Sequence, residues 1–470
     1  MTNRFKICHC FHFVENILFL HLMKPILTFL TILFCPFISL GQGIAVPETP
    51  QPATFQQVQP HVNIMPQQRH SFGAIEQTPA TLPNHYLADK ERIERQRIEY
   101  QREVASINED IQALEQSRYI NSMLDTTFGK PPVMSKQQYE AGKSFWDALV
   151  ILTDMQQGKR DFSITEAVYT VENAYLRDKL NKEDFIQSVQ LRAELCRQII
   201  KQEKLDPTSN LAKHFAIQKL YQQDHKYNDP NSRKKISIPK LGYDFTDFMG
   251  DSSHTQMFVS KLLTTGKGQC HSMPLLYLCI AEQLGVKAYL SLAPEHSFIR
   301  FTDENGNLYN FETTNGKIVS DKWVLQSGYI NTTALQNKIY LDTLTQKQLL
   351  SLCILDLAMG YQVDYGYDGF TETALKYALK LYPTGIQNHI MLSNFWATKM
   401  FSAIKYYKIT NPETLPRYPI AHTLQKRMLR EYEIIDRLGY QQMPKEAYQA
   451  WLQSVDEERE KQNKQLSKQR

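Results

Sequence analysis

A chain of 470 residues is too long for one hydrophobic core, and its 42% hydrophobic and 22% charged residues are close to the averages of folded proteins. These values predict two or three folded domains and exclude a largely disordered chain. The net charge of +4 is small for this length, and basic and acidic residues alternate along the chain, so we expect no basic surface that binds nucleic acid.

The N-terminal residues have the pattern of an export signal. A positive start at Met23 and Lys24 precedes the apolar run 26–40, and a small, polar Gly-Gln-Gly sequence follows. A secretory signal peptide has such a start, an apolar core of about 7–15 residues and a small-residue exit. We therefore predict that residues 1–42 are an over-extended start plus a signal peptide, and that the protein is exported to the periplasm or cell surface. An N-terminal membrane anchor over residues 17–40 is the alternative.

The cysteines fit an exported protein without a disulfide framework. Of seven cysteines, those that would remain after removal of the leader are Cys196, Cys270, Cys279 and Cys353. Small secreted domains that depend on disulfides have many more cysteines for their length, so we expect no disulfide framework here. A single disulfide remains an open alternative.

The next segments change from linker to helix. Residues 43–85 are rich in Pro, Gln and Thr and have no apolar period, which predicts a flexible linker. Apolar residues at helical spacing over 93–114 predict either a short coiled coil or an amphipathic helix packed on its own domain. Similar patterns continue, so 86–228 is predicted to be a helical region. It contains a capping pattern at Ser163 and ends before the break Asp229-Pro230-Asn231.

The central segment, 240–335, has a mixed pattern. An apolar helix is predicted over 275–284, and β-prone stretches follow at 286–292, 296–302 and 308–314. From residue 336 to 470 the pattern is helical again, with one hairpin over 357–383 that resembles a tetratricopeptide unit. The expected fold is therefore α+β, with a small core of helix and antiparallel sheet flanked by N- and C-terminal α-helical regions.

Cys270 begins the central helix in the run Gly266-Lys-Gly-Gln-Cys-His-Ser-Met-Pro274. A cysteine at a helix start lies where free backbone N–H groups and the helix dipole favour thiolate over thiol. The same N–H groups, especially that of Cys270, could hold a developing oxyanion. Glycines in this run allow a tight turn and a close approach of substrate. A cysteine in such a position is, by itself, usually a small buried residue. His271, beside it, is interpreted as solvated or structural.

His296 and Glu312 supply the base and acid that a thiol nucleophile needs. They lie on successive strands, and their distance depends on the turn between those strands. With a two-residue turn, Glu312 would lie opposite Ile299 and the two side chains would point to opposite faces. With a three-residue turn over 304–306, Glu312 would lie opposite Phe298, on the same face as His296 and about 7–8 Å away diagonally. The triad therefore requires the three-residue turn.

These residues resemble a known family. The runs Lys267-Gly-Gln-Cys-His-Ser-Met-Pro274, Leu284-Gly-Val286, Glu295-His-Ser-Phe-Ile-Arg300 and Asn310-Phe-Glu-Thr313 are similar to the transglutaminase-like superfamily, in particular to an exported bacterial branch. The resemblance covers residues 258–329. It implies a papain-like arrangement in the core, in which Cys270 is the nucleophile, His296 is the base and Glu312 is the acid that orients the base. The acid in the wider superfamily is usually Asp, so Glu312 departs from the pattern.

Two functions are consistent with these residues. The first is an exported cysteine-dependent hydrolase or acyltransferase that acts on amide or peptide bonds of an envelope-associated protein or peptide through a thioester. The second is a catalytically idle transglutaminase-like module that serves as a helical scaffold for a protein partner. We expect no cofactor. A metal site is not expected either, because Cys270, His271, Cys279 and His296 lack a standard ligand spacing.

Overall fold

The structure is a computed structural model that describes residues 136–228, 235–248, 250, 252–441, 457 and 460. These residues belong to one compact unit. None of the helices in these ranges is long and apolar enough to cross a membrane. The predicted leader, linker and 93–114 helix lie outside the described residues.

The described part of the N-terminal helical region, residues 136–228, is helical as predicted and contains four helices: α4 (Lys136–Gln156), α5 (Ile164–Tyr175), α6 (Lys182–Gln202) and α7 (Asn210–Gln222). The predicted cap of α5 is present, because the side chain of Ser163 accepts a hydrogen bond from the Glu166 N–H at 3.2 Å. Such a cap satisfies one of the N–H groups that a helix start leaves unpaired.

A short hairpin follows α7, where the sequence analysis found only a polar break. Strands β1 (His225–Asn228) and β2 (Lys235–Ile238) pair antiparallel, with His225 opposite Ile238. Each strand has one buried apolar residue, Tyr227 and Ile238. One apolar side chain per strand is too weak a pattern to predict a strand from sequence.

The central core combines a helix with an antiparallel sheet of order β5-β6-β7-β8. The elements are β3 (Gly242–Tyr243), α8 (Val259–Thr265), β4 (Lys267–Gly268), α9 (Ser272–Gln283), β5 (Ala288–Ala293), β6 (His296–Thr302), β7 (Leu308–Glu312) and β8 (Lys317–Val319). The predicted helix and three predicted strands are all present. The fourth strand, β8, is only three residues long and was not predicted.

The turn between β6 and β7 is the one that the triad requires. Ile299 pairs with Phe311, which places Glu312 opposite Phe298. The N–H of Asp303 donates to the Asn307 carbonyl at 3.1 Å, so residues 304–306 form a three-residue turn. The Asp303 carboxylate also accepts from the backbone N–H groups of residues 305 and 307, at 2.9 and 2.8 Å. This carboxylate therefore stabilises the longer turn, as Asp side chains do in loops.

The sheet is covered on both faces. On one face, Phe301 stacks on His214 of α7 with ring centroids 4.2 Å apart, and Phe311 lies 5.6 Å from Tyr277 of α9. On the other face, Phe298 packs with Val324 of α10 (Asp321–Ser327). The strands are therefore buried on both sides, which holds the residues at the end of β6 in fixed positions.

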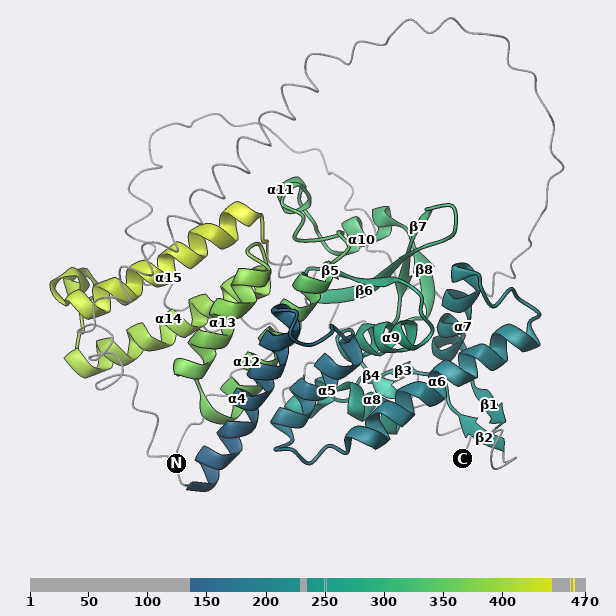
Figure 1. Ribbon diagram of the computed structural model, residues 1–470. Coiled ribbons are helices and arrows are strands. Elements are labelled where there is room, and N and C mark those ends of the chain that lie inside the picture. The colour runs from purple at the N-terminus through teal and green to yellow at the C-terminus, as the bar shows by residue number, and fades with distance from the viewer. Residues whose placement is uncertain are drawn as a thin grey trace, which may run out of the picture. The chain divides into compact units, whose positions relative to one another are not determined.

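The C-terminal region consists mainly of α11 (Thr332–Gln336), α12 (Gln346–Tyr365), α13 (Gly369–Leu381), α14 (Ile386–Tyr407) and α15 (Pro419–Leu438). Helices α12 and α13 form the predicted hairpin, and α12 also packs against α4 and α5 (Figure 1). A Cβ on Gly360 of α12 would lie 3.2 Å from a ring atom of Tyr175 in α5, so the two helices approach closely. The observed fold is α+β with flanking helical regions, as predicted.

Candidate active site

Cys270 lies two residues before α9, in a segment with little space for side chains. Helix α8 ends at Gly266, whose φ of 68° is in the left-handed region. A Cβ on Gly268 would lie 2.7 Å from the hydroxyl oxygen of Ser272, too close for any larger residue. These glycines let the chain turn tightly from α8 into α9.

The buried side chain of Gln269 occupies the backbone donors at the start of α9. Its Oε1 accepts from the N–H groups of His271 and Ser272 at 2.7 and 3.1 Å, and its carbonyl accepts from the Met273 N–H at 3.0 Å. The N–H of Cys270 has no acceptor among the described residues. Among the backbone N–H groups that were predicted to stabilise an oxyanion, the N–H of Cys270 is therefore the one that is available.

His296 and Glu312 form a close pair at the end of the sheet. His296 Nε2 lies 2.5 Å from Glu312 Oε2, and the side chain of Glu312 is only 3% exposed. The other carboxylate oxygen accepts from the backbone N–H and the hydroxyl of Thr314, at 3.0 and 2.8 Å. Burial would raise the pKa of Glu312, but the charge of His296 and these hydrogen bonds lower it overall. The acid is therefore held in its ionised form.

Cys270 is a further hydrogen-bond partner of this histidine. Burial alone would lower the pKa of His296, but the charge of Glu312 and hydrogen bonds with Cys270 and Glu312 raise it well above its ordinary value. Because Nε2 contacts Glu312, Nδ1 is the nitrogen left for the thiol. The Cys270 sulfur also lies 3.9 Å from the Glu295 carbonyl oxygen, and the Ser297 hydroxyl donates to the Cys270 carbonyl at 2.5 Å. The three predicted site residues are thus brought together.

A second histidine–carboxylate pair lies on the other side of Cys270. His271 Nε2 is 3.2 Å from Asp356 Oδ2, and the two side chains are 31% and 21% exposed. Burial lowers the pKa of His271, but the charge and hydrogen bond of Asp356 and the charge of Cys270 raise it overall. His271 is therefore a paired residue of the site and not a solvated one. Asp356 comes from α12, far along the chain, and no sequence motif indicated it.

Tyr243 of β3 is another neighbour that the sequence analysis missed. Burial and the charges of Cys270 and Glu312 raise its pKa well above the ordinary value, which keeps the phenol neutral. It reaches the site because β3 pairs in parallel with β4, with Tyr243 opposite Gly268. A two-residue strand has no sequence signal of its own.

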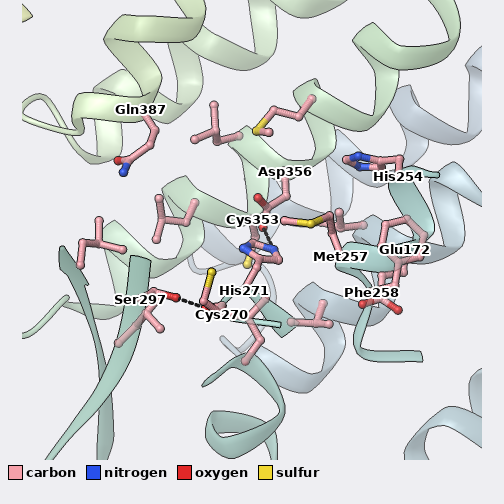
Figure 2. A pocket seen from close by; sticks show the side chains of 18 of the residues that line it. Glu172, His254, Met257, Phe258, Cys270, His271, Ser297, Cys353, Asp356 and Gln387 are labelled. Atoms are coloured by element: carbon pink, nitrogen blue, oxygen red, sulfur yellow. Dashed lines mark hydrogen bonds and ion pairs between the residues drawn. The ribbon is translucent and has the colours of Figure 1, made fainter. Parts of the chain in front are cut away.

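The Cys270 sulfur points into a pocket between the core and α12 (Figure 2). The pocket contains about 1060 Å³ of empty space, including solvent at its mouth. In Figure 2, Gln387 of α14 lies on the same side as Ser297, and Glu172 and His254 lie at the opposite end. The site is therefore formed jointly by the core and by helices on both sides of it in the sequence. Among the described residues, no cluster of three or more His, Cys, Asp or Glu is arranged to hold a metal ion.

Comparison with known proteins agrees with this fold. The model of the transglutaminase-like superfamily matches residues 210–354. This segment runs from the start of α7 into α12 and contains Cys270, His296 and Glu312. No match was found among curated proteins or solved structures. The chain therefore contains a domain of the transglutaminase-like superfamily.

Proposed function

We propose that this protein is a cysteine-dependent hydrolase or acyltransferase that acts on amide or peptide bonds through a thioester at Cys270. The observation that carries the proposal is the pairing of His296 Nε2 with Glu312, together with the hydrogen bond to Cys270 that helps to raise the His296 pKa. The match of residues 210–354 to the transglutaminase-like superfamily is consistent with cysteine chemistry, but a fold alone does not specify a reaction.

The proposed reaction uses the three residues in sequence. The Cys270 thiolate attacks the amide carbonyl, and the Cys270 N–H donates to the oxygen that becomes negative. Protonated His296 then gives its proton to the departing amine, which leaves an acyl thioester on Cys270. Water or an amine attacks this thioester, and neutral His296 takes the proton from the attacking group. The C–S bond then breaks, which releases the new acid or amide and regenerates the Cys270 thiolate beside protonated His296. Glu312 keeps the imidazole oriented and stabilises its charged form throughout.

We also propose that the reaction takes place after export, in the periplasm or at the cell surface. The support is the signal-peptide pattern at residues 23–43. An envelope protein or peptide is then the proposed substrate, and the flanking helices offer surfaces for a protein partner. Fractionation of cells, followed by sequencing of the mature N-terminus, tests this: an uncleaved, cytoplasmic protein would contradict it.

The pH dependence of Cys270 alkylation tests the chemistry. The full chain is labelled with iodoacetamide, and Cys270 is followed by peptide mass spectrometry in the wild type and in His296→Ala. We expect wild-type labelling to persist at pH 6, and to fall at least about tenfold in the variant, because an ordinary thiol is about 1% thiolate or less at that pH. His422→Ala, on the partly buried surface of α15, is the matched control and should behave as the wild type.

Labelling that follows an ordinary thiol titration in both proteins would contradict the proposal. So would a Cys270 that reacts only after unfolding. Either result would favour the alternative function, a catalytically idle module that acts as a helical scaffold.

A further inference from the structure

The backbone at the start of α9 offers only one open donor for an oxyanion. The N–H of Cys270 is available, but the side-chain oxygen of Gln269 occupies the N–H groups of His271 and Ser272. The NH₂ group of Gln269 does not serve either, because it contacts the sulfur of Met257. Oxyanion holes combine preorganised backbone and side-chain donors, and each donor has a large effect on the rate. A side-chain donor beside the thiol would therefore complete the hole.

The side chain of His271 has the position of such a donor. It lines the same pocket as Cys270 and is 31% exposed. Its Nε2 atom lies 3.2 Å from Asp356 Oδ2, and the side chain has no other hydrogen-bond or ion-pair partner among the described residues. In Figure 2, the ring of His271 lies between Asp356 and the Cys270 sulfur. Nδ1 is therefore the ring nitrogen that is left for a bound molecule.

Nδ1 can donate a hydrogen bond only while the ring is protonated. A neutral imidazole has a single N–H, and the contact of Nε2 with the Asp356 carboxylate uses it. The protonated ring has an N–H on both nitrogens. Burial lowers the pKa of His271, but the charge and hydrogen bond of Asp356 and the charge of Cys270 raise it overall. The surroundings therefore favour the form of His271 that can donate through Nδ1.

Besides the thiol, three elements carry titratable groups on this side of the pocket. Helix α12 contributes Asp356 and Cys353, α5 contributes Glu172, and the 3₁₀ helix η4 (His254–Met257) contributes its first residue. Burial raises the pKa of Glu172 to about 7, and the charge of Glu172 is a further cause of the raised His271 pKa. None of the described lining residues is a lysine or an arginine. No permanent cation of the pocket lining therefore competes with His271 for an oxyanion.

From these features we infer that protonated His271 is the second oxyanion donor of the site, through Nδ1, and that Asp356 is the residue that positions its ring. The inference deepens the proposed function and rests on it. When the Cys270 sulfur attacks a carbonyl carbon, the C–S bond forms and the electron pair of the C=O π bond moves to oxygen. The Cys270 N–H and the Nδ1–H of His271 donate to this oxygen until the carbonyl forms again and the leaving group departs with its bonding pair. His296 still transfers the protons, so the two histidines have separate roles.

Two reactions of Cys270 in the full chain test this inference, acetylation by p-nitrophenyl acetate and alkylation by iodoacetamide. Both consume the thiolate, but only acetylation forms an oxyanion. Because p-nitrophenolate leaves without a proton, acetylation does not need the acid role of His296. The rate of p-nitrophenol release, corrected for the release by Cys270→Ala, is divided by the alkylation rate of the same protein, which cancels changes in thiolate content. This acetylation-to-alkylation ratio is then compared with that of N-acetylcysteine methylamide.

At pH 6 we expect a wild-type ratio at least about tenfold above that of the small thiol, and a decrease of at least about tenfold in His271→Ala, because removal of one oxyanion donor typically costs about 10²–10³ in rate. His271→Asn, whose NH₂ group can take the place of Nδ1–H, should recover part of the ratio. His422→Ala on α15 is the matched control and should leave the ratio unchanged. A wild-type ratio equal to that of the small thiol, or one that His271→Ala does not change, would overturn the inference.

The pH profile of this ratio separates a hydrogen-bond donor from a merely structural residue. The wild-type ratio should decrease as pH rises through the His271 pKa, which is raised from 6.5, because Nδ1 then loses its proton. Asp356→Asn should match the wild type at pH 5 and show the decrease at lower pH, and His271→Asn should show no such decrease. A pH-independent wild-type ratio, a ratio lowered equally at all pH values in Asp356→Asn, or a decrease that Glu172→Gln abolishes would each contradict a donor at Nδ1.

The same measurements distinguish a failure of this inference from a failure of the proposed function. If alkylation of Cys270 depends on His296 but the ratio does not depend on His271, the thiol chemistry stands and the second donor is removed. If the ratio depends on His271 but alkylation follows an ordinary thiol titration, the donor stands and the pairing of Cys270 with His296 fails.

Discussion

Replacing Glu312 by glutamine should change both the reactivity and the stability of the protein. The carboxylate is buried, and one of its oxygens is held by the N–H and hydroxyl of Thr314. Glutamine fits the same space, and its carbonyl oxygen can keep these two hydrogen bonds. Its NH₂ group then faces His296 Nε2, which must become an acceptor. The proton of neutral His296 moves to Nδ1, the nitrogen that should receive the Cys270 proton.

The stability cost follows from the charged hydrogen bond that is lost. Hydrogen bonds to charged groups contribute about 1.5–3 kcal/mol, so we expect Glu312→Gln to lower the free energy of unfolding by about 2 kcal/mol near pH 6. The Glu312 pKa is lowered from 4.5, so its contribution is present above pH 4.5 and is lost as pH falls through the folded pKa. The His296 pKa is raised from 6.5, so its contribution is complete below pH 6.5 and is lost as pH rises through the folded pKa. The cost should therefore be largest between these pH values and decrease on both sides.

Two measurements check this prediction. Urea unfolding at several pH values gives the stability cost, and iodoacetamide labelling gives the reactivity of Cys270. We expect the variant to label at least about tenfold more slowly at pH 6, because the Cys–His ion pair is lost. Glu312→Asp keeps the charge and should recover part of the labelling rate. The reasoning is refuted if Glu312→Gln labels with the wild-type pH profile, or if its stability cost is the same at all pH values.

Three further predictions concern the surroundings of the site. Asp356→Asn removes the charge that faces His271, so the NMR titration of the His271 ring should shift to lower pH. The free energy of unfolding should fall by about 0.5–1 kcal/mol, because the pair is partly exposed. An unshifted His271 titration would contradict the pairing. Burial raises the pKa of Glu172 to about 7, so wild-type stability should fall by roughly 3 kcal/mol or less as pH rises from 4.5 to 7. Glu172→Gln cannot ionise and should lose less stability over that range in urea unfolding; parallel curves would refute this assignment. Gly268→Ala should cost about 1–3 kcal/mol in thermal or urea unfolding, because the new Cβ would lie 2.7 Å from the Ser272 hydroxyl oxygen; a wild-type midpoint would show that the segment can move.

Much of the core could be predicted because its signals are local. The central helix has a continuous apolar run that ends before Gly285, whose φ is 60°. Strand β6 was predicted over its observed bounds, His296–Thr302, because its apolar and polar residues alternate and a turn sequence follows. Short elements such as β1, β2 and β8 were missed, since a few residues do not establish a period.

The candidate site was predictable in part for the same reason. Cys270, His296 and Glu312 each lie at a helix start or on a predicted strand, so their types and order could be read directly. The sequence was compatible with two turns after β6, and these put Glu312 on different faces of the sheet. The structure has the longer turn, in which the Asp303 carboxylate binds the loop backbone.

The sequence by itself determined the elements of the core and the three residues that suggest thiol chemistry. Only the tertiary structure decided what surrounds them: Gln269 occupies the neighbouring backbone donors, Asp356 pairs with His271, and Gln387 reaches the pocket from α14. These contacts depend on how α12 and α14 pack against the core. Packing between distant segments follows from the shapes of whole surfaces, and it leaves no fixed spacing of residue types along the chain.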